Sequence, residues 1–199
     1  MTTPIPSGGT PIHSVPRGAV SPNATASTGM VTVWDPAVRL LHWTIAASFA
    51  VAWLSAEEVM PLHEAAGFVI LVAVGVRSLW GLIGTPHARF AGFVPSPGGL
   101  LSYMGALVKG RAGRYVGHNP AGGAMIVALL ASLLLTVATG IVLDTGGGVL
   151  GEDTMEDIHG AAATVTLILV VLHVGGVILS SVLHRENLVR AMVTGRKRA

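Results

Sequence analysis

Two histidines stand fourteen residues apart in the last long apolar run of the chain, at His159 and His173. At ~100° and ~1.5 Å per residue, fourteen residues of α-helix return to within ~40° of the same face after a rise of ~21 Å. Both imidazoles are therefore expected on one stripe of a helix, at two depths. A buried imidazole in lipid is costly without a partner, and haem iron is a common one. The spacing predicts two axially ligated cofactors stacked along the membrane normal.

The composition places these histidines in a membrane. Hydrophobic residues make up 51% of the 199 residues, charged residues only 11%, and the mean hydropathy is +0.68. Ordinary soluble domains have roughly one quarter charged residues, so the sequence predicts an integral membrane protein. The net charge is only +2 and the basic residues are scattered at helix ends, which argues against a nucleic-acid partner. The chain has no cysteine, so His, Met or carboxylate must hold any cofactor.

Four apolar runs are long enough to be spanning helices. Residues 1–30 are rich in Pro, Gly, Ser and Thr and are predicted to be a disordered cytoplasmic tail, with no signal peptide. Residues 31–199 are predicted to be one four-helix membrane domain. Between the second and third spans lies a polar, basic segment, 85–120, whose middle is a candidate interfacial helix. The predicted spans are about 38–56, 64–84, 121–143 and 157–183.

The distribution of basic residues predicts the orientation. The 85–120 segment and the tail after Leu183 contain nine of the twelve Lys and Arg residues, whereas the loops 57–62 and 144–156 contain none. By the positive-inside rule, both termini should be cytoplasmic, in the inner membrane of a bacterium.

This orientation sorts the histidines into two layers. The first helix enters from the cytoplasm, so His42 near its start lies near the inner surface. The second helix enters from outside, so His63 at its start lies near the outer surface. The fourth helix puts His159 outside and His173 ~21 Å further in. We therefore predict an outer pair, His63 with His159, and an inner pair, His42 with His173. Two imidazoles close both axial positions of an iron, which suits an electron carrier.

Other histidines are not predicted to be ligands. One histidine at a helix end is usually just an interfacial residue, and His87, His118 and His184 are interpreted as interfacial residues or as neighbours of a haem propionate. Four histidines that pair by depth are much harder to obtain by accident.

Arg77 is the one basic residue well inside a predicted span. It follows His63 by fourteen residues, so it should lie on the cofactor-facing stripe at the depth of the inner pair. A haem propionate would supply the anion that a buried guanidinium needs. The alternative is that Arg77 extends to the cytoplasmic surface. Arg39, three residues before His42, is predicted to be a second propionate contact.

The outer loops carry a different charge pattern. Eight of the ten acids fall there without a single base. This pattern is either a solvated surface that sets topology, or an electrostatic dock for a basic redox partner.

Six short motifs stand in order along residues 33–198; they are RLLHW (39–43), LHE (62–64), RSLWG (77–81), HARF (87–90), GHNPAG (117–122) and HRENLVRAMVTGRK (184–197). In these motifs and their spacing the sequence resembles the prokaryotic cytochrome b561 proteins and the related b-type cytochrome subunits of hydrogenases and formate dehydrogenases. The resemblance implies an all-α integral membrane protein, a four-transmembrane-helix bundle that binds two b haems, with ligands at the four histidines paired above. A departure is Gly160, where many relatives carry a carboxylate.

The expected function is electron transfer between the quinone pool and a redox partner, or superoxide, at the periplasmic face. The protein would then be an oxidoreductase that acts on quinone, or an electron carrier. An alternative is a membrane anchor subunit of a larger periplasmic oxidoreductase. An alternative of another class is a transporter whose histidines relay protons or bind a metal ion, but the repeats and broken helices typical of transporters are not evident.

Overall fold

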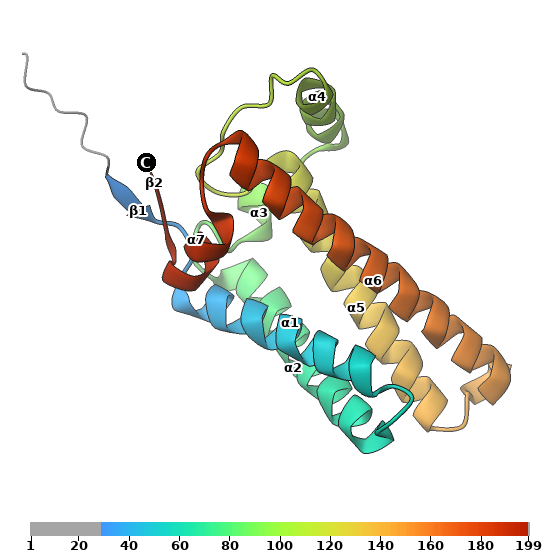
Figure 1. Cartoon of the computed structure of the whole chain (residues 1–199). Coiled ribbons are helices and arrows are strands. Elements are labelled where there is room, and N and C mark those ends of the chain that lie inside the picture. Colours follow the sequence, from blue (N-terminus) through green and yellow to red (C-terminus); the bar gives the residue numbers. More distant parts are fainter. Residues whose placement is uncertain (1–28, 199) are drawn as a thin grey trace, which may run out of the picture.

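The computed structural model describes residues 29–198 and is mostly helical (Figure 1). The four long helices end within one residue of the predicted spans, and all four begin earlier than predicted, the first by two residues and the third by one. The second begins four residues before 64 and the fourth five residues before 157, where Glu152 and Asp153 favour the positive end of the helix dipole. Four helices are long and apolar enough to cross a membrane: α1 (Pro36–Ser55), α2 (Met60–Ile83), α5 (Pro120–Asp144) and α6 (Glu152–Leu183).

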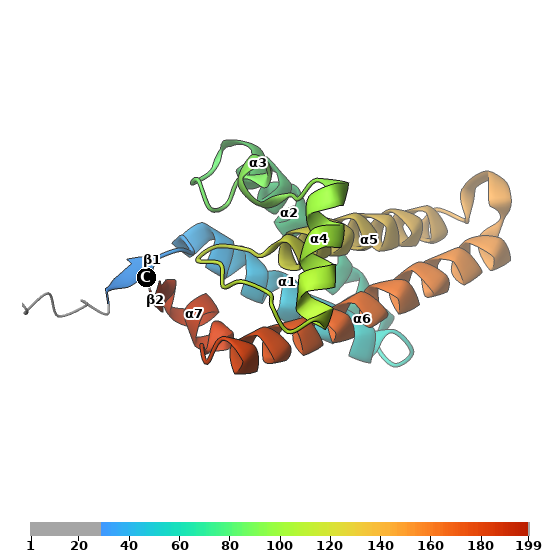
Figure 2. The same ribbon diagram turned by 90° about the horizontal axis from the view of Figure 1, so that it is seen from above.

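Shorter helices occupy the ends of the bundle. Helices α3 (Phe90–Phe93) and α4 (Pro97–Val108) lie within the basic segment between α2 and α5. Figures 1 and 2 show α4 lying across the direction of the spans, as an interfacial helix would. The turn η1 (Gly148–Leu150) joins α5 to α6, and α7 (Leu188–Thr194) follows α6.

A two-stranded sheet is the one non-helical element in residues 29–198, and the all-α prediction did not include it. Strand β1 (Met30–Thr32) pairs antiparallel with β2 (Arg196–Arg198), with Met30 opposite Arg198. Residues 1–28 of the predicted 1–30 tail lie outside the described residues, and Met30, at the end of the predicted tail, belongs to β1.

Helix starts follow local sequence signals. Asp35, Ser96 and Asn119 each precede a proline, and each side chain accepts a hydrogen bond from a backbone N–H of the first helical turn. Such caps satisfy donors that have no partner inside the helix, and proline at the first position loses no hydrogen bond. The start of α1 therefore follows directly from Asp35 and Pro36.

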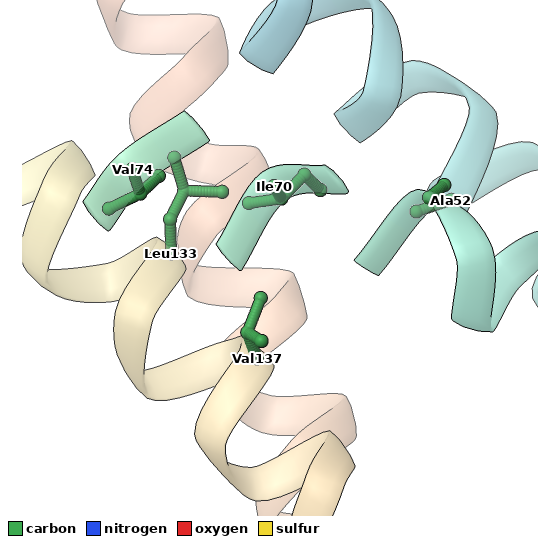
Figure 3. Close-up of a cluster of buried hydrophobic side chains, with 6 residues drawn as sticks. Ala52, Ile70, Val74, Leu133 and Val137 are labelled. Atoms are coloured by element: carbon green, nitrogen blue, oxygen red, sulfur yellow. The ribbon is translucent and has the colours of Figure 1, made fainter. Parts of the chain in front are cut away.

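The long helices pack in the order α1–α2–α5–α6, so α1 and α6 are not among the extensively packed pairs. Thr166 on α6 is fully buried, and its hydroxyl lies 3.0 Å from that of Thr136 on α5. Most other span side chains present apolar surface outward, for example Leu54 and Ile83. The core is small and centred on α2 (Figure 3); its buried members are Ala52, Ala66, Ile70, Val74, Leu133 and Val137.

Candidate functional site

The outer pair joins α2 to α6. The rings of His63 and His159 have centroids 6.0 Å apart and planes inclined by 82°. The Nδ1 of His63 lies 2.8 Å from the carbonyl oxygen of Ala52 on α1, and that of His159 lies 3.0 Å from the carbonyl oxygen of Thr136 on α5. A carbonyl oxygen only accepts, so each Nδ1 must carry the proton. The Nε2 lone pair of each ring is thereby left for a metal ion, the arrangement typical of ligating histidines.

Helix α5 is shaped around His159. A Cβ at Gly140 would lie 3.0 Å from the Cε1 of His159, which is tighter than ordinary van der Waals contact. The hydroxyl of Thr139 lies 3.2 Å from the Nδ1 of the same ring. The glycine therefore admits the imidazole, and the threonine and carbonyl fix its rotation.

The inner pair joins α1 to α6. The rings of His42 and His173 have centroids 6.4 Å apart and planes inclined by 52°. The edge of Trp43 packs against His42 at 5.1 Å. The Nδ1 of His42 is buried and has no hydrogen-bond partner within residues 29–198. This ring is held by packing, without the backbone acceptor that each outer ring has.

Both gaps fit one metal ion between two imidazoles. Two metal–nitrogen bonds of about 2 Å plus two imidazole radii of about 1.2 Å span roughly 6 Å, close to both measured separations. Within the described residues no three or more His, Asp or Glu side chains gather as a metal cluster. The donor sets therefore suit ions that need only two protein ligands, as in a haem.

Arg77 is only 6% exposed and does not reach the surface. Its Nη2 donates to the carbonyl oxygen of Ala88 at 3.3 Å, and its guanidinium lies 5.6 Å from the ring centroid of Phe90. Its Nη1 is buried without a partner in the described chain. The spans supply no acid here, but Asp35, the cap of α1, is near enough to interact electrostatically with Arg77. One edge of the guanidinium therefore remains available to an anion.

Arg39 makes a contact that the sequence did not predict. Its Nη2 donates to the carbonyl oxygen of Val193 on α7, and its Nε is buried without a partner in residues 29–198. Arg39 thus joins the start of α1 to the segment after α6.

His118 was predicted to be an interfacial residue or a neighbour of a haem propionate, and it lies between two aromatic rings. Its ring centroid is 4.4 Å from that of Trp34 and 4.7 Å from that of Phe93. Burial, and then the positive charges of Arg77 and Lys197, lower the pKa of His118 to about 3. The imidazole is therefore neutral at physiological pH. Its position next to the α5 cap, in the GHNPAG motif, was the available signal.

Asp35 connects α1 to the end of α2. Its carboxylate accepts hydrogen bonds from the Thr85 hydroxyl at 2.6 Å and from the Trp80 indole at 3.2 Å, besides capping α1 through Val38. Burial alone would raise the pKa of Asp35, but these hydrogen bonds outweigh it and hold the pKa below its usual value. The carboxylate stays ionised beside the basic residues of this end.

The remaining predicted features lie at the surface. His87 is exposed, and His184 terminates α6. The acidic end is defined by eight exposed acids at the α1–α2 and α5–α6 connections and the adjoining helix ends; its members are Glu57, Glu58, Glu64, Asp144, Glu152, Asp153, Glu156 and Asp157.

Comparison with known proteins gives a consistent result. Residues 33–195 match the family model described as prokaryotic cytochrome b561. The chain is 25% identical over 214 aligned positions to a probable Ni/Fe-hydrogenase B-type cytochrome subunit of Rhizobium leguminosarum bv. viciae, covering 84% of this chain and 88% of the relative. No solved structure matches the chain.

Proposed function

The chain belongs to the prokaryotic cytochrome b561 family, and from that premise we propose that it is a di-haem cytochrome b that moves electrons between the quinone pool and a periplasmic redox partner or superoxide. Membership of the family, together with the hydrogenase cytochrome relative, indicates a bacterial membrane protein that binds haem b and transfers electrons. The number of haems, the quinone and the periplasmic partner are parts of the proposal.

The observation that carries the proposal is the presence of two imidazole pairs, 6.0 and 6.4 Å apart, that share α6. In the proposal, His63 and His159 hold the outer haem and His42 and His173 hold the inner one. Bound haem supplies an iron that gains and loses one electron. The four imidazoles would hold the two irons, two for each, and would leave no protein-free site on the metal for oxygen or substrate. Fourteen residues of α6, ~21 Å, separate the two ligand positions, so each haem lies towards one face of the membrane.

Arginines balance the charge of the inner haem in this proposal. Arg77 offers its unpaired Nη1 to a propionate, because a buried guanidinium without an anion is costly. Arg39 offers its Nε, although its Nη2 is committed to Val193. A planar guanidinium can bind a carboxylate through two hydrogen bonds, which suits Arg77 better than Arg39.

We propose that both termini are cytoplasmic and that the acidic end faces the periplasm. The exposed acids there, without one Lys or Arg in either loop, favour a partner with a basic docking surface. Electron transfer to such a partner should slow as salt is added, since exposed charges are screened within ~10 Å at 0.1 M salt. A rate that is independent of salt would leave the acids as a solvated surface that sets topology.

A second candidate is an anchor and electron-transfer subunit of a larger periplasmic oxidoreductase. The hydrogenase cytochrome relative favours it, because the alignment covers most of both chains. Copurification of a large oxidoreductase subunit, together with no quinol oxidation by the isolated chain, would favour this candidate over the stand-alone cytochrome.

A reduced-minus-oxidised optical spectrum of the purified protein, with the haem-to-chain ratio, tests the proposal. Two low-spin b haems per chain are expected. One haem per chain, or a high-spin spectrum, would contradict the di-haem assignment. An absence of haem would instead favour the histidine-lined transporter.

A further inference from the structure

We propose that residues 187–198, called the strap below, position the inner haem site by joining α1 to the end of α6. This inference rests on the proposed function, because the inner site is defined there. The strap comprises α7 and β2 and returns from α6 to the strand that leads into α1. Figure 1 shows α7 and β2 beside β1 and the start of α1.

The inner site needs such a connection. His42 lies on α1 and His173 on α6, and these two helices are not among the extensively packed pairs of the bundle. The Nδ1 of His42 also has no partner within residues 29–198. Neither direct helix packing nor a ring hydrogen bond therefore fixes the separation of this pair, and another part of the chain must do so.

The strap is hydrogen-bonded to the start of α1. Strands β1 and β2 pair in register, and the carbonyl oxygen of Gly195 accepts hydrogen bonds from the backbone N–H groups of Val33 and Trp34 at 2.9 and 3.2 Å. Arg39, one helical turn before His42, donates to the carbonyl oxygen of Val193. A change in the strap is thus transmitted directly to the turn of α1 that carries His42.

Buried charge fixes the strap in one place. Lys197 is 5% exposed; its Nζ lies 3.1 Å from the carbonyl oxygen of Tyr115 and 3.4 Å from the carboxylate of Glu186. Glu186 also pairs with Arg114 at 3.3 Å. A buried lysine is tolerated only where such partners exist, so it disfavours any other position of β2.

Trp34 extends the connection to His118. It is 7% exposed, packs with Val33 and Ala191 in one buried cluster, and its ring meets His118. Through Trp34, the strap is therefore linked to His118 as well as to α1. The outer imidazoles contact the carbonyl oxygens of Ala52 on α1 and Thr136 on α5 instead.

Gly195→Ala is the substitution that tests the strap. The φ of Gly195 is +79°, and an added Cβ would lie 2.6 Å from the carbonyl oxygen of Trp34, so even alanine must displace this junction. Gly110→Ala is the matched control, because Gly110 has a φ of +66° but nothing within 4 Å of its Cβ position. The readouts are the haem-to-chain ratio and the two midpoint potentials from a redox titration of the full chain.

Gly195→Ala should shift the midpoint of the inner haem or lower the ratio from two haems towards one, with the outer haem unchanged. Gly110→Ala should change neither. The outer haem reports that the variant is folded. An unchanged inner haem in Gly195→Ala, or an equal change in both haems, would overturn the proposal.

A disulfide rescue provides the second test. Thr32 and Arg196 are opposite one another in the sheet and both are exposed, and the chain has no cysteine of its own. In the Gly195→Ala background, a disulfide between Thr32→Cys and Arg196→Cys should restore the midpoint potential of the inner haem. Reduction of that disulfide should abolish the recovery. Formation of the disulfide without recovery would contradict a positioning role.

Spin labels at Leu40→Cys and Leu183→Cys test the strap without haem. Both positions are exposed, on α1 and at the end of α6. The distance distribution should broaden in Gly195→Ala and not in Gly110→Ala. If wild type binds no haem but the distribution still broadens, the proposed function fails while the mechanical role of the strap stands. An unbroadened distribution removes that role.

Discussion

The outer and inner imidazole pairs are alike in separation but differ in how their rings are held. Each outer ring donates from Nδ1 to a backbone carbonyl oxygen of a neighbouring helix, and Gly140 leaves room for one of them. The inner ring of His42 has no such acceptor within the described chain, and its ring neighbours are Trp43 and His173. The outer site is thus formed by the spans themselves.

One bundle therefore positions two similar imidazole pairs by two means. Backbone carbonyl oxygens orient the outer rings and raise their basicity. The inner pair depends on side chains and loops, whose charges would also tune a metal held there in the proposed function. We therefore expect the outer site to be the more rigid and the inner site to be the more easily altered from outside the spans.

Loss of a ligand should have the largest effect. His159→Ala should empty only the outer site and His173→Ala only the inner one, because each removes one axial imidazole. The haem-to-chain ratio should fall from two to one, and the remaining midpoint identifies the site that is left. Loss of both haems from a single substitution, in protein that keeps its helical circular dichroism, would contradict the assignment of two separate sites.

Gly140→Ala should weaken the outer site alone. The added Cβ would press on the Cε1 of a ring that Thr136 and Thr139 hold in place, so the strain is not easily relieved. Overpacking of this kind typically costs about 1–3 kcal/mol. The measurement is haem retention at each site during dilution, with the inner haem as the internal control. Equal retention at both sites would show that His159 can move freely.

Arg77→Gln should shift the inner midpoint and leave the outer one in place. Removal of a buried positive charge favours the oxidised haem, which carries one more positive charge, so the inner midpoint should fall while the propionate remains ionised. Arg77→Lys, which keeps the charge but not the planar fork, should shift it less. Potentiometry decides the matter. If neither midpoint moves and haem content is unchanged, Arg77 does not contact the haem.

Acid should destabilise the basic end through His118. Its pKa is about 3 when folded and ordinarily 6.5, so between these values the unfolded chain binds a proton that the folded chain does not. Stability must therefore fall as the pH is lowered from 6.5 towards 3. Thermal loss of the inner haem should move to lower temperature over this range, and His118→Gln should reduce the dependence. If His118→Gln leaves the pH dependence of thermal haem loss unchanged, other titrating groups cause that dependence.

The smallest expected effect is spectroscopic, and it distinguishes the two sites without any mutation. Nearly perpendicular imidazole planes keep two iron d orbitals close in energy, which makes the low-spin electron paramagnetic resonance signal more anisotropic. The outer planes are inclined by 82° and the inner ones by 52°, so the outer haem should give the signal with the larger maximal g value. The signal with the larger maximal g value should be lost selectively in His63→Ala. If that signal survives in His63→Ala, it belongs to the inner haem and the assignment is reversed.

Much of this arrangement follows from the sequence, for a physical reason. The four long helices follow from composition and run length, and the family resemblance is confirmed by the matching model. Helical geometry converts the spacing of His159 and His173 into depth, and the structure brings His63 and His42 to the corresponding levels. Their role as ligands remains a prediction.

Other features were beyond the reach of the sequence. The acceptors of the outer rings are backbone carbonyl oxygens, which leave no trace in residue type. Strands of three residues are too short to show a period, and β1 pairs with a segment at the far end of the described chain. The burial of His118 depends on that same closure through Trp34, which the residues around His118 in the sequence do not reveal, so it was predicted only as an interfacial or propionate-neighbouring residue.

The pairing of β1 with β2 also sets an order of assembly. Strand β2 lies beyond α6, so it can meet β1 only after all four long helices have been inserted into the membrane. Closing so long a loop is slow compared with helix formation. In the proposed di-haem arrangement with a cytoplasmic basic end, the outer site would be complete first during biosynthesis, and the basic end would stay open for a time, as a route by which a haem could enter before the chain closes behind it.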